Sequence, residues 1–159
     1  MAGFLETNNA ERAYRTFCEM LDDQGWKYDR NDGNMEISSG AKGDDLPINI
    51  LVKVDADKQL VTLLSKLPFK APEEEIALTA IGVCAANFNM VDGSFDLNPQ
   101  TGSIIFRLTT SIRDSLISKD AFEYMLYVSC STIDNYNDKF LGLIKHTISL
   151  EEFLDFAKE

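Results

Sequence analysis

The sequence contains a single histidine, His146, which excludes histidine-rich metal sites and catalytic histidine pairs. The three cysteines, Cys18, Cys84 and Cys130, stand far apart in the chain. They therefore match neither a disulfide framework nor the paired spacing of a zinc site. Each lies within a helical pattern and is expected to be a buried, reduced thiol. We therefore expect no metal site and no cofactor.

Long hydrophobic runs and clustered cations are also missing. No run approaches the roughly 18 apolar residues that a membrane-spanning helix needs, and the first residues lack the basic and apolar regions of a signal peptide. Fifteen Lys and Arg stand against 26 Asp and Glu, a formal net charge of -11, and the cations are scattered. Because phosphate binding needs clustered cations, we expect a cytoplasmic protein that binds neither membranes nor nucleic acid.

The common catalytic motifs are absent: Gly-x-Ser-x-Gly, His-Glu-x-x-His, Cys-x-x-Cys and the glycine fingerprint of dinucleotide-binding proteins. Four polar residues alternate as at the start of a calcium-binding loop, namely Asp92, Ser94, Asp96 and Asn98. The resemblance fails because Leu97 and Ser103 occupy the positions that require Gly and Glu. The sequence therefore predicts no catalytic residue and no enzyme.

The length and hydrophobic content are those of one domain. The chain has 159 residues, of which 45% are hydrophobic, and a domain of this size buries roughly 68–70% of its unfolded surface. There is no internal repeat of fixed period and no linker long enough to separate two domains. We expect a single domain over residues 1–159.

The periodicity of the apolar residues predicts an α+β fold in the order α-β-β-β-β-α-β-β-α-α. An antiparallel β-sheet would carry helices mainly on one face. The first helix is expected to begin at Asn8 or Asn9 and to end at Gly25, and a short hairpin turns at residues 31–33. Residues 38–45 are predicted to form a mobile surface loop, and Pro68 and Pro72 to mark another loop.

Three later helices have recognisable starts. The second follows Pro72 and Glu73–Glu75, and its predicted buried stripe is Ile76, Ala80, Val83, Cys84 and Phe88. Ser118 is predicted to cap a long helix with a narrow buried stripe of Phe122, Leu126, Ser129, Ile133, Tyr136, Phe140 and Leu143. Ser149 and Glu152 form a capping box for a short last helix.

The clearest hairpin covers residues 91–110. Phe95 and Leu97 alternate on one side, and Ile104, Phe106 and Leu108 alternate on the other. The residues between them, Asn98 to Gly102, have the composition of a turn. This stretch predicts two paired strands.

Several strands carry apolar residues on both faces. If Ile48, Ile50, Val52 and Val54 point into the core, Leu51 points away from it, and Leu60, Leu64 and Ile105 do the same on other strands. A sheet with one solvated face should alternate more strictly, so these four residues predict a second, covered face. We therefore expect Leu51, Leu60, Leu64 and Ile105 to form an interaction surface, covered by another part of the chain or by a partner.

The run Ala86-Asn87-Phe88-Asn89, followed by Gly93-Ser94-Phe95-Asp96-Leu97 and Gly102-Ser103-Ile104-Ile105-Phe106-Arg107, resembles the YbjN family. With the order of elements, the resemblance spans the chain from the first helix to the last long one. It implies a fold like that of type III secretion chaperones, and the family is loosely described as bacterial sensory transduction regulators. The resemblance carries no catalytic residues.

Two classes of function follow. The first is a non-enzymatic protein-interaction module, a regulator or chaperone-like protein acting as a homodimer or with a protein partner, including pairing of an extended client along a sheet edge. The alternative is a small-molecule sensor or enzyme with a cleft between the sheet and the long helix. Tyr136, Asn135 or His146 would then supply polar contacts.

Overall fold

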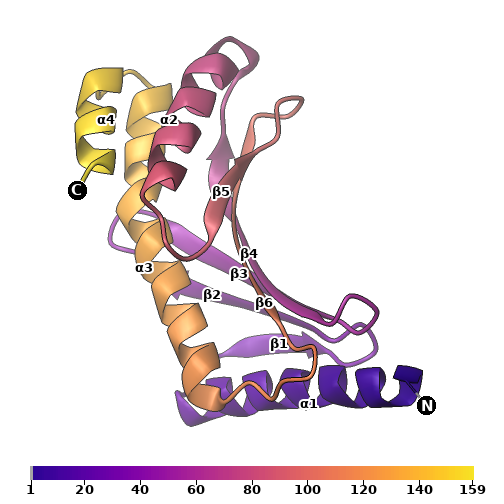
Figure 1. Cartoon of the computed structure of the whole chain (residues 1–159). Coiled ribbons are helices and arrows are strands. Elements are labelled where there is room, and N and C mark those ends of the chain that lie inside the picture. Colours follow the sequence, from indigo (N-terminus) through magenta and orange to yellow (C-terminus); the bar gives the residue numbers. More distant parts are fainter. Residues whose placement is uncertain (1) are drawn as a thin grey trace.

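The computed structural model describes the backbone of residues 2–159 and the side chains of residues 9–159. Four α-helices, one short 3-10 helix and six β-strands follow one another in the predicted order (Figure 1). Their bounds are α1 Ala2–Asp23, β1 Tyr28–Asn31, β2 Glu36–Lys42, β3 Pro47–Asp55, β4 Leu60–Lys70, η1 Glu73–Glu75, α2 Ile76–Phe88, β5 Ser94–Leu97, β6 Ser103–Ser111, α3 Lys119–Ile144 and α4 Leu150–Ala157.

The six strands form one antiparallel sheet in the order β1-β2-β3-β4-β6-β5. Hairpins connect β1 to β4 in sequence. After β4 the chain passes through α2 and returns with the β5–β6 hairpin, so that β6 pairs with β4 and the short β5 lies at the edge. The α+β fold class and the hairpin over residues 91–110 are confirmed.

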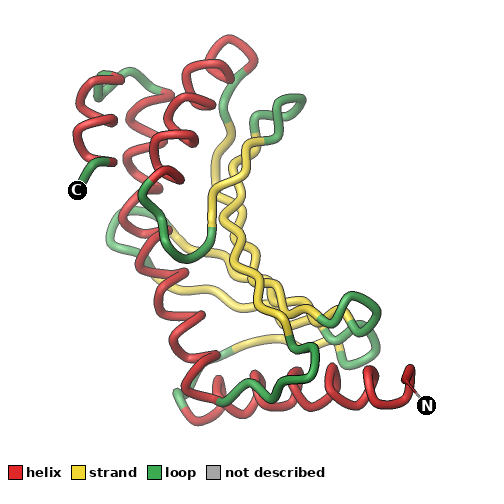
Figure 2. The backbone as a smooth tube through the Cα atoms, in the orientation of Figure 1, coloured by secondary structure: helices red, strands yellow, loops and turns green. Residues whose placement is uncertain are grey.

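All four helices lie on one side of the twisted sheet (Figures 1 and 2). Along β3 and β4 the side chains that face the helices alternate with less buried ones, and they pack with residues of α1 and α3 in one hydrophobic core. In that core the ring of Phe17 from α1 lies 4.9 Å from the ring of Phe122 from α3. We call the opposite side of the sheet, which no described helix covers, the outer face.

The helix ends explain where the chain turns. Gly25, at φ +69°, ends α1, since the Trp26 amide donates to the Leu21 carbonyl at 2.9 Å as in a Schellman motif. The predicted caps of the last two helices are confirmed. The Ser118 hydroxyl accepts from the Ala121 amide, and Ser149 and Glu152 exchange both bonds of a capping box.

Three predicted boundaries were wrong. Helix α1 begins at Ala2, because its first residues include good helix formers and an asparagine does not stop a helix already begun. Residues 38–42 belong to β2, where pairing with β3 overrides the weak strand propensity of Gly and Ser. Strand β4 continues to Lys70, and Pro68 lies in the register shift between Lys66 and Lys70, where a missing amide is tolerated.

The predicted buried stripe of α2 was wrong for three of its five residues. The buried residues are Thr79, Gly82, Val83 and Ala86, whereas Ala80, Cys84 and Phe88 are exposed. Helix α2 has no charged residue, so its apolar periodicity could not identify the face that meets the core. The prediction of buried thiols therefore holds for Cys18 only, since Cys130 is half-buried and Cys84 is exposed.

Candidate interaction surfaces

The outer face holds all four residues that the sequence selected as an interaction surface. Leu51, Leu60, Leu64 and Ile105 are half-buried, and none of them packs in the core. Leu51 lies directly opposite Leu64 in the β3–β4 pair. Ile105 is opposite Lys66, so it is the diagonal neighbour of Leu64. Leu51, Leu64 and Ile105 thus form one contiguous group, the outer patch, whereas Leu60 lies farther along β4.

Cations surround the outer patch although the chain as a whole is strongly acidic. Lys53 and Arg107 form ion pairs with Glu36 at 3.0 Å and with Asp96 at 2.8 Å. Lys66, beside Ile105, has no ion pair within the described part of the chain. The outer patch is therefore an apolar surface with one uncompensated positive charge next to it.

A second apolar surface lies on α2, where the predicted buried stripe failed. We call it the α2 surface, formed by Ala77, Ala80, Ile81, Cys84 and Phe88. Phe88 is 86% exposed and Ile81 is 48% exposed. A groove of about 510 Å³ runs between this helix and α4, where Leu154 and Ala157 complete its wall. Exposed apolar groups grouped in this way are typical of an interaction site.

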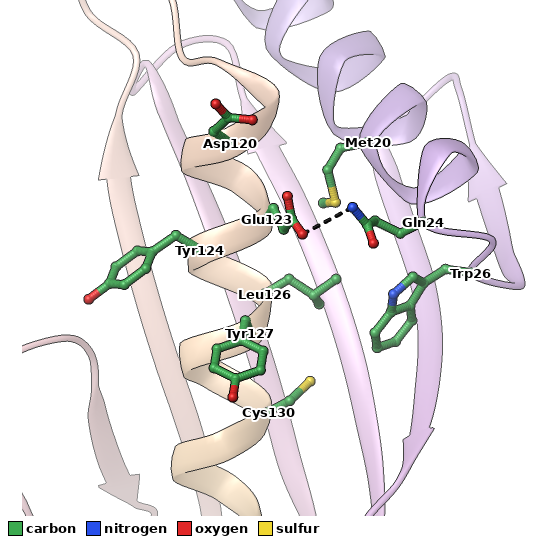
Figure 3. Close-up of a pocket in the computed structure, with 9 residues that line it drawn as sticks. All are labelled: Met20, Gln24, Trp26, Asp120, Glu123, Tyr124, Leu126, Tyr127 and Cys130. Atoms are coloured by element: carbon green, nitrogen blue, oxygen red, sulfur yellow. Dashed lines mark hydrogen bonds between the residues drawn. The ribbon is translucent and has the colours of Figure 1, made fainter.

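A third feature is a cavity of about 390 Å³ beside α3, which we call the α3 cavity (Figure 3). It is lined by Met20, Gln24, Trp26, Asp120, Glu123, Tyr124, Leu126, Tyr127 and Cys130. In Figure 3 the Trp26 side chain comes from the segment after α1, and Tyr127 comes from α3. No Lys, Arg or His belongs to the described lining.

Hydrogen bonds fix two side chains at the α3 cavity. The Gln24 amide nitrogen Nε2 donates to Glu123 Oε1 at 3.0 Å, and the Tyr124 hydroxyl donates to Asp92 at 2.5 Å. The bond to Asp92 raises the pKa of Tyr124. Burial, with a smaller effect of the Asp134 carboxylate, raises the pKa of the Cys130 thiol to about 11. The raised pKa favours the protonated thiol at pH 7, which is the less reactive form.

The three polar residues proposed for the alternative function lie apart from the α3 cavity. The Tyr136 ring packs edge-to-face against Phe95 and Phe156 at 5.5 and 5.2 Å between centroids, and Asn135 is exposed. His146, at φ +58°, ends α3, since the Thr147 amide donates to the Gly142 carbonyl at 2.9 Å. Its Nε2 atom lies 2.6 Å from a Glu75 carboxylate oxygen. None of the three residues lines the α3 cavity.

A different cleft does exist between the sheet and α3. It has a volume of about 320 Å³ and lies between β6 and the first turns of α3, with Leu108, Ile117 and Met125 among its lining residues. The alternative function expected a cleft between the sheet and the long helix, but none of Tyr136, Asn135 and His146 lines this one. The sequence analysis did not identify the α3 cavity. The sequence feature that could have indicated the α3 cavity is the pair Tyr124 and Tyr127, two aromatic residues of α3 that lie outside its predicted buried stripe.

The described residues include no group of three or more His, Cys, Asp or Glu side chains placed to hold a metal ion. Within the same part of the chain, no helix has both the length and the apolar composition needed to cross a membrane.

Comparisons with known proteins support the fold but do not identify a function. No family model and no curated protein matches the sequence. Among solved structures, the chain is similar to YbjN from E. coli, which is proposed to be a transcription regulator, with 11% identity, a TM-score of 0.57 and coverage of 76% of this chain and 85% of that one. It is also similar to a chain of the HopA1–SchA chaperone–effector complex, with 8% identity, a TM-score of 0.52 and coverage of 80% and 95%. At such identities the likeness concerns the fold alone.

Proposed function

We propose that this chain is a non-enzymatic protein-interaction module that binds a segment of a partner protein on the outer face of its sheet. The observation that supports this most is the outer patch, where Leu51, Leu64 and Ile105 stay in contact with water although the other face of the same strands is fully packed. Covering these side chains would remove apolar area from water and so favour binding.

The charges around the outer patch favour one kind of occupant. Lys66 would meet a carboxylate on the bound segment, so the partner is expected to combine apolar side chains with acidic ones. The structural similarity to a chain of a chaperone–effector complex supports the proposal, because a protein of this fold takes part there in a complex between proteins. We further propose that residues 1–159 act as one domain, in the cytoplasm.

The double variant Leu51→Asp with Ile105→Asp should lose the partner, because two buried charges would face the bound segment. Tagged wild type and variant would be used to capture proteins from a lysate of the native cells, followed by mass spectrometry. We expect at least about a tenfold depletion of the specific partner with the variant. Ser131→Asp, an exposed position on α3, is the matched control. Equal capture by all three proteins would contradict the proposal, and thermal unfolding would confirm that the variants are folded.

Self-association is a second version of the same function, and the α2 surface favours it. A helix that has apolar residues all round is normally buried, yet Ile81 and Phe88 are exposed in the single chain. A second copy related by a two-fold axis would place the same helix opposite itself, with small Ala77 and Ala80 allowing a close approach.

Light scattering over a concentration series tests this version. The wild-type protein should show the mass of a dimer, and Phe88→Asp should shift it to the monomer at the same concentration, because a charge would be buried in the interface. Leu116→Asp is the control, since Leu116 is a 64% exposed apolar residue outside α2. A wild-type protein that stays monomeric at high concentration would contradict self-association through α2.

A further inference from the structure

The α3 cavity has the composition of a site for an organic cation. We propose that it binds a guanidinium or alkylammonium group, which would lie against the rings of Trp26 and Tyr127 with its charge beside Glu123 (Figure 3). The cavity lies on the helical side of the sheet, so this inference is independent of the outer patch.

The aromatic walls are the first reason. The faces of Trp and Tyr rings attract cations, with Trp the strongest, and this attraction is the basis of aromatic cages for alkylammonium groups. Trp26 is half-buried and Tyr127 is 74% exposed, so a ligand would enter from the Tyr127 side and reach the indole. The volume of about 390 Å³ lies within the usual range for small-ligand pockets and exceeds the needs of one arginine side chain.

The carboxylates are the second reason. Glu123 accepts one hydrogen bond, from Gln24 to its Oε1 atom, and no other described side chain pairs with it. Asp120 has no side-chain partner among the described residues. Lys119, which precedes Asp120 in the chain, forms ion pairs with Asp23 at 2.8 Å and Glu19 at 3.5 Å. The described residues therefore leave negative charge at the cavity uncompensated.

Other classes of ligand fit less well. An anion would meet Glu123 and Asp120 without any lining cation. A neutral apolar molecule would desolvate Glu123 without replacing its contacts with water. A divalent metal ion would need more oxygen ligands than the two carboxylates supply, and the described residues offer no such group. A monovalent organic cation can contact the aromatic rings and also pair its charge with a carboxylate.

The only tryptophan of the chain is Trp26, so its fluorescence reports directly on the cavity. The probes are N-acetyl-argininamide and tetramethylammonium, with N-acetyl-citrullinamide as the neutral match of the first. We expect a saturable change in emission with both cations, at 150 mM salt, and at least about tenfold weaker binding of the citrulline compound. Salt at this level screens non-specific attraction to the acidic chain.

Two variants test the assigned residues. Glu123→Gln keeps a group that can accept the Gln24 bond but removes the charge, and Tyr127→Leu removes one ring. Each is expected to weaken N-acetyl-argininamide binding about fivefold to tenfold. Glu151→Gln, which removes an exposed charge on α4, should leave it unchanged. Because Glu123 and Tyr127 are exposed, both variants are expected to fold.

The source of the cation is tested with a capped Gly-Gly-Arg-Gly-Gly peptide. Binding of the peptide at least as tight as that of N-acetyl-argininamide supports a side chain of a protein as the ligand, and binding of the free cations alone supports a small metabolite. Either result supports the cation site. Absence of saturable binding, equal binding of the citrulline compound, or equal weakening by Glu123→Gln and Glu151→Gln would overturn it.

Discussion

Replacing Phe140 with alanine should lower the free energy of unfolding by about 3–5 kcal/mol, the usual cost of deleting a buried phenylalanine. Phe140 is fully buried on α3, and its ring lies 5.1 Å from both Phe95 and Phe153 and 6.0 Å from Tyr136. The ring therefore joins α3 to the edge strand β5 and to α4. Its removal leaves a cavity between three elements that cannot all collapse onto it.

Thermal and denaturant unfolding measure this effect. For a chain of this length the loss corresponds to a drop in Tm on the order of 10 °C. Val91→Ala is the control, because Val91 is 93% exposed and its truncation should change the free energy of unfolding by less than about 0.5 kcal/mol. Equal losses for the two variants would contradict the assignment of Phe140 to the buried core.

The second large effect is expected for Gly102→Ala. Gly102 ends the turn between β5 and β6 at φ +73°, and a Cβ atom there would overlap the carbonyl group of Ala71. The two residues are also hydrogen-bonded, since the Ala71 amide donates to the Gly102 carbonyl at 2.8 Å. Left-handed strain and the overlap with main chain together should cost about 3 kcal/mol or more.

Gly25→Ala distinguishes the cost of left-handed backbone strain from the cost of overlap with main-chain atoms. Gly25 has nearly the same backbone angle, φ +69°, but nothing lies within 4 Å of the position its Cβ would take. Its replacement should therefore cost only the left-handed strain, about 1–2 kcal/mol. Chemical denaturation of both variants gives the comparison. A Gly102→Ala variant no less stable than Gly25→Ala would show that the contact between the β5–β6 turn and Ala71 is not close.

The strands could be predicted because burial on one face imposes alternation. Ile48, Ile50, Val52 and Val54 are all buried, and the alternation placed Leu51 on the other face, where the structure has it. The buried face of α2 was predicted wrongly because this alternation is missing there. A helix with apolar residues on every side contains no alternation between faces, so only the tertiary structure decides that Val83 is buried and Phe88 is not.

The features that could not be predicted depend on contacts between residues far apart in the sequence. Residues 38–42 have loop-like composition, and they form a strand because β3 supplies hydrogen-bond partners. The α3 cavity joins Trp26 with Tyr127, whose proximity depends on how the end of α1 packs beside α3. No local pattern contains that information. The positions of Leu51, Leu64 and Ile105 on the outer face, by contrast, could be predicted from the sequence, because they follow from the alternation of side chains along each strand.

The most direct test of binding at the outer face is photo-crosslinking in the native cells, with a photoreactive amino acid in place of Leu64. Leu64 lies at the centre of the outer patch, between Leu51 and Arg107 in the sheet. The proposed function predicts a covalent adduct with a different protein from position 64, and none from the control position Ser131 on α3. No adduct from Leu64, an adduct only with a second copy, or the same adducts from Ser131 would contradict it.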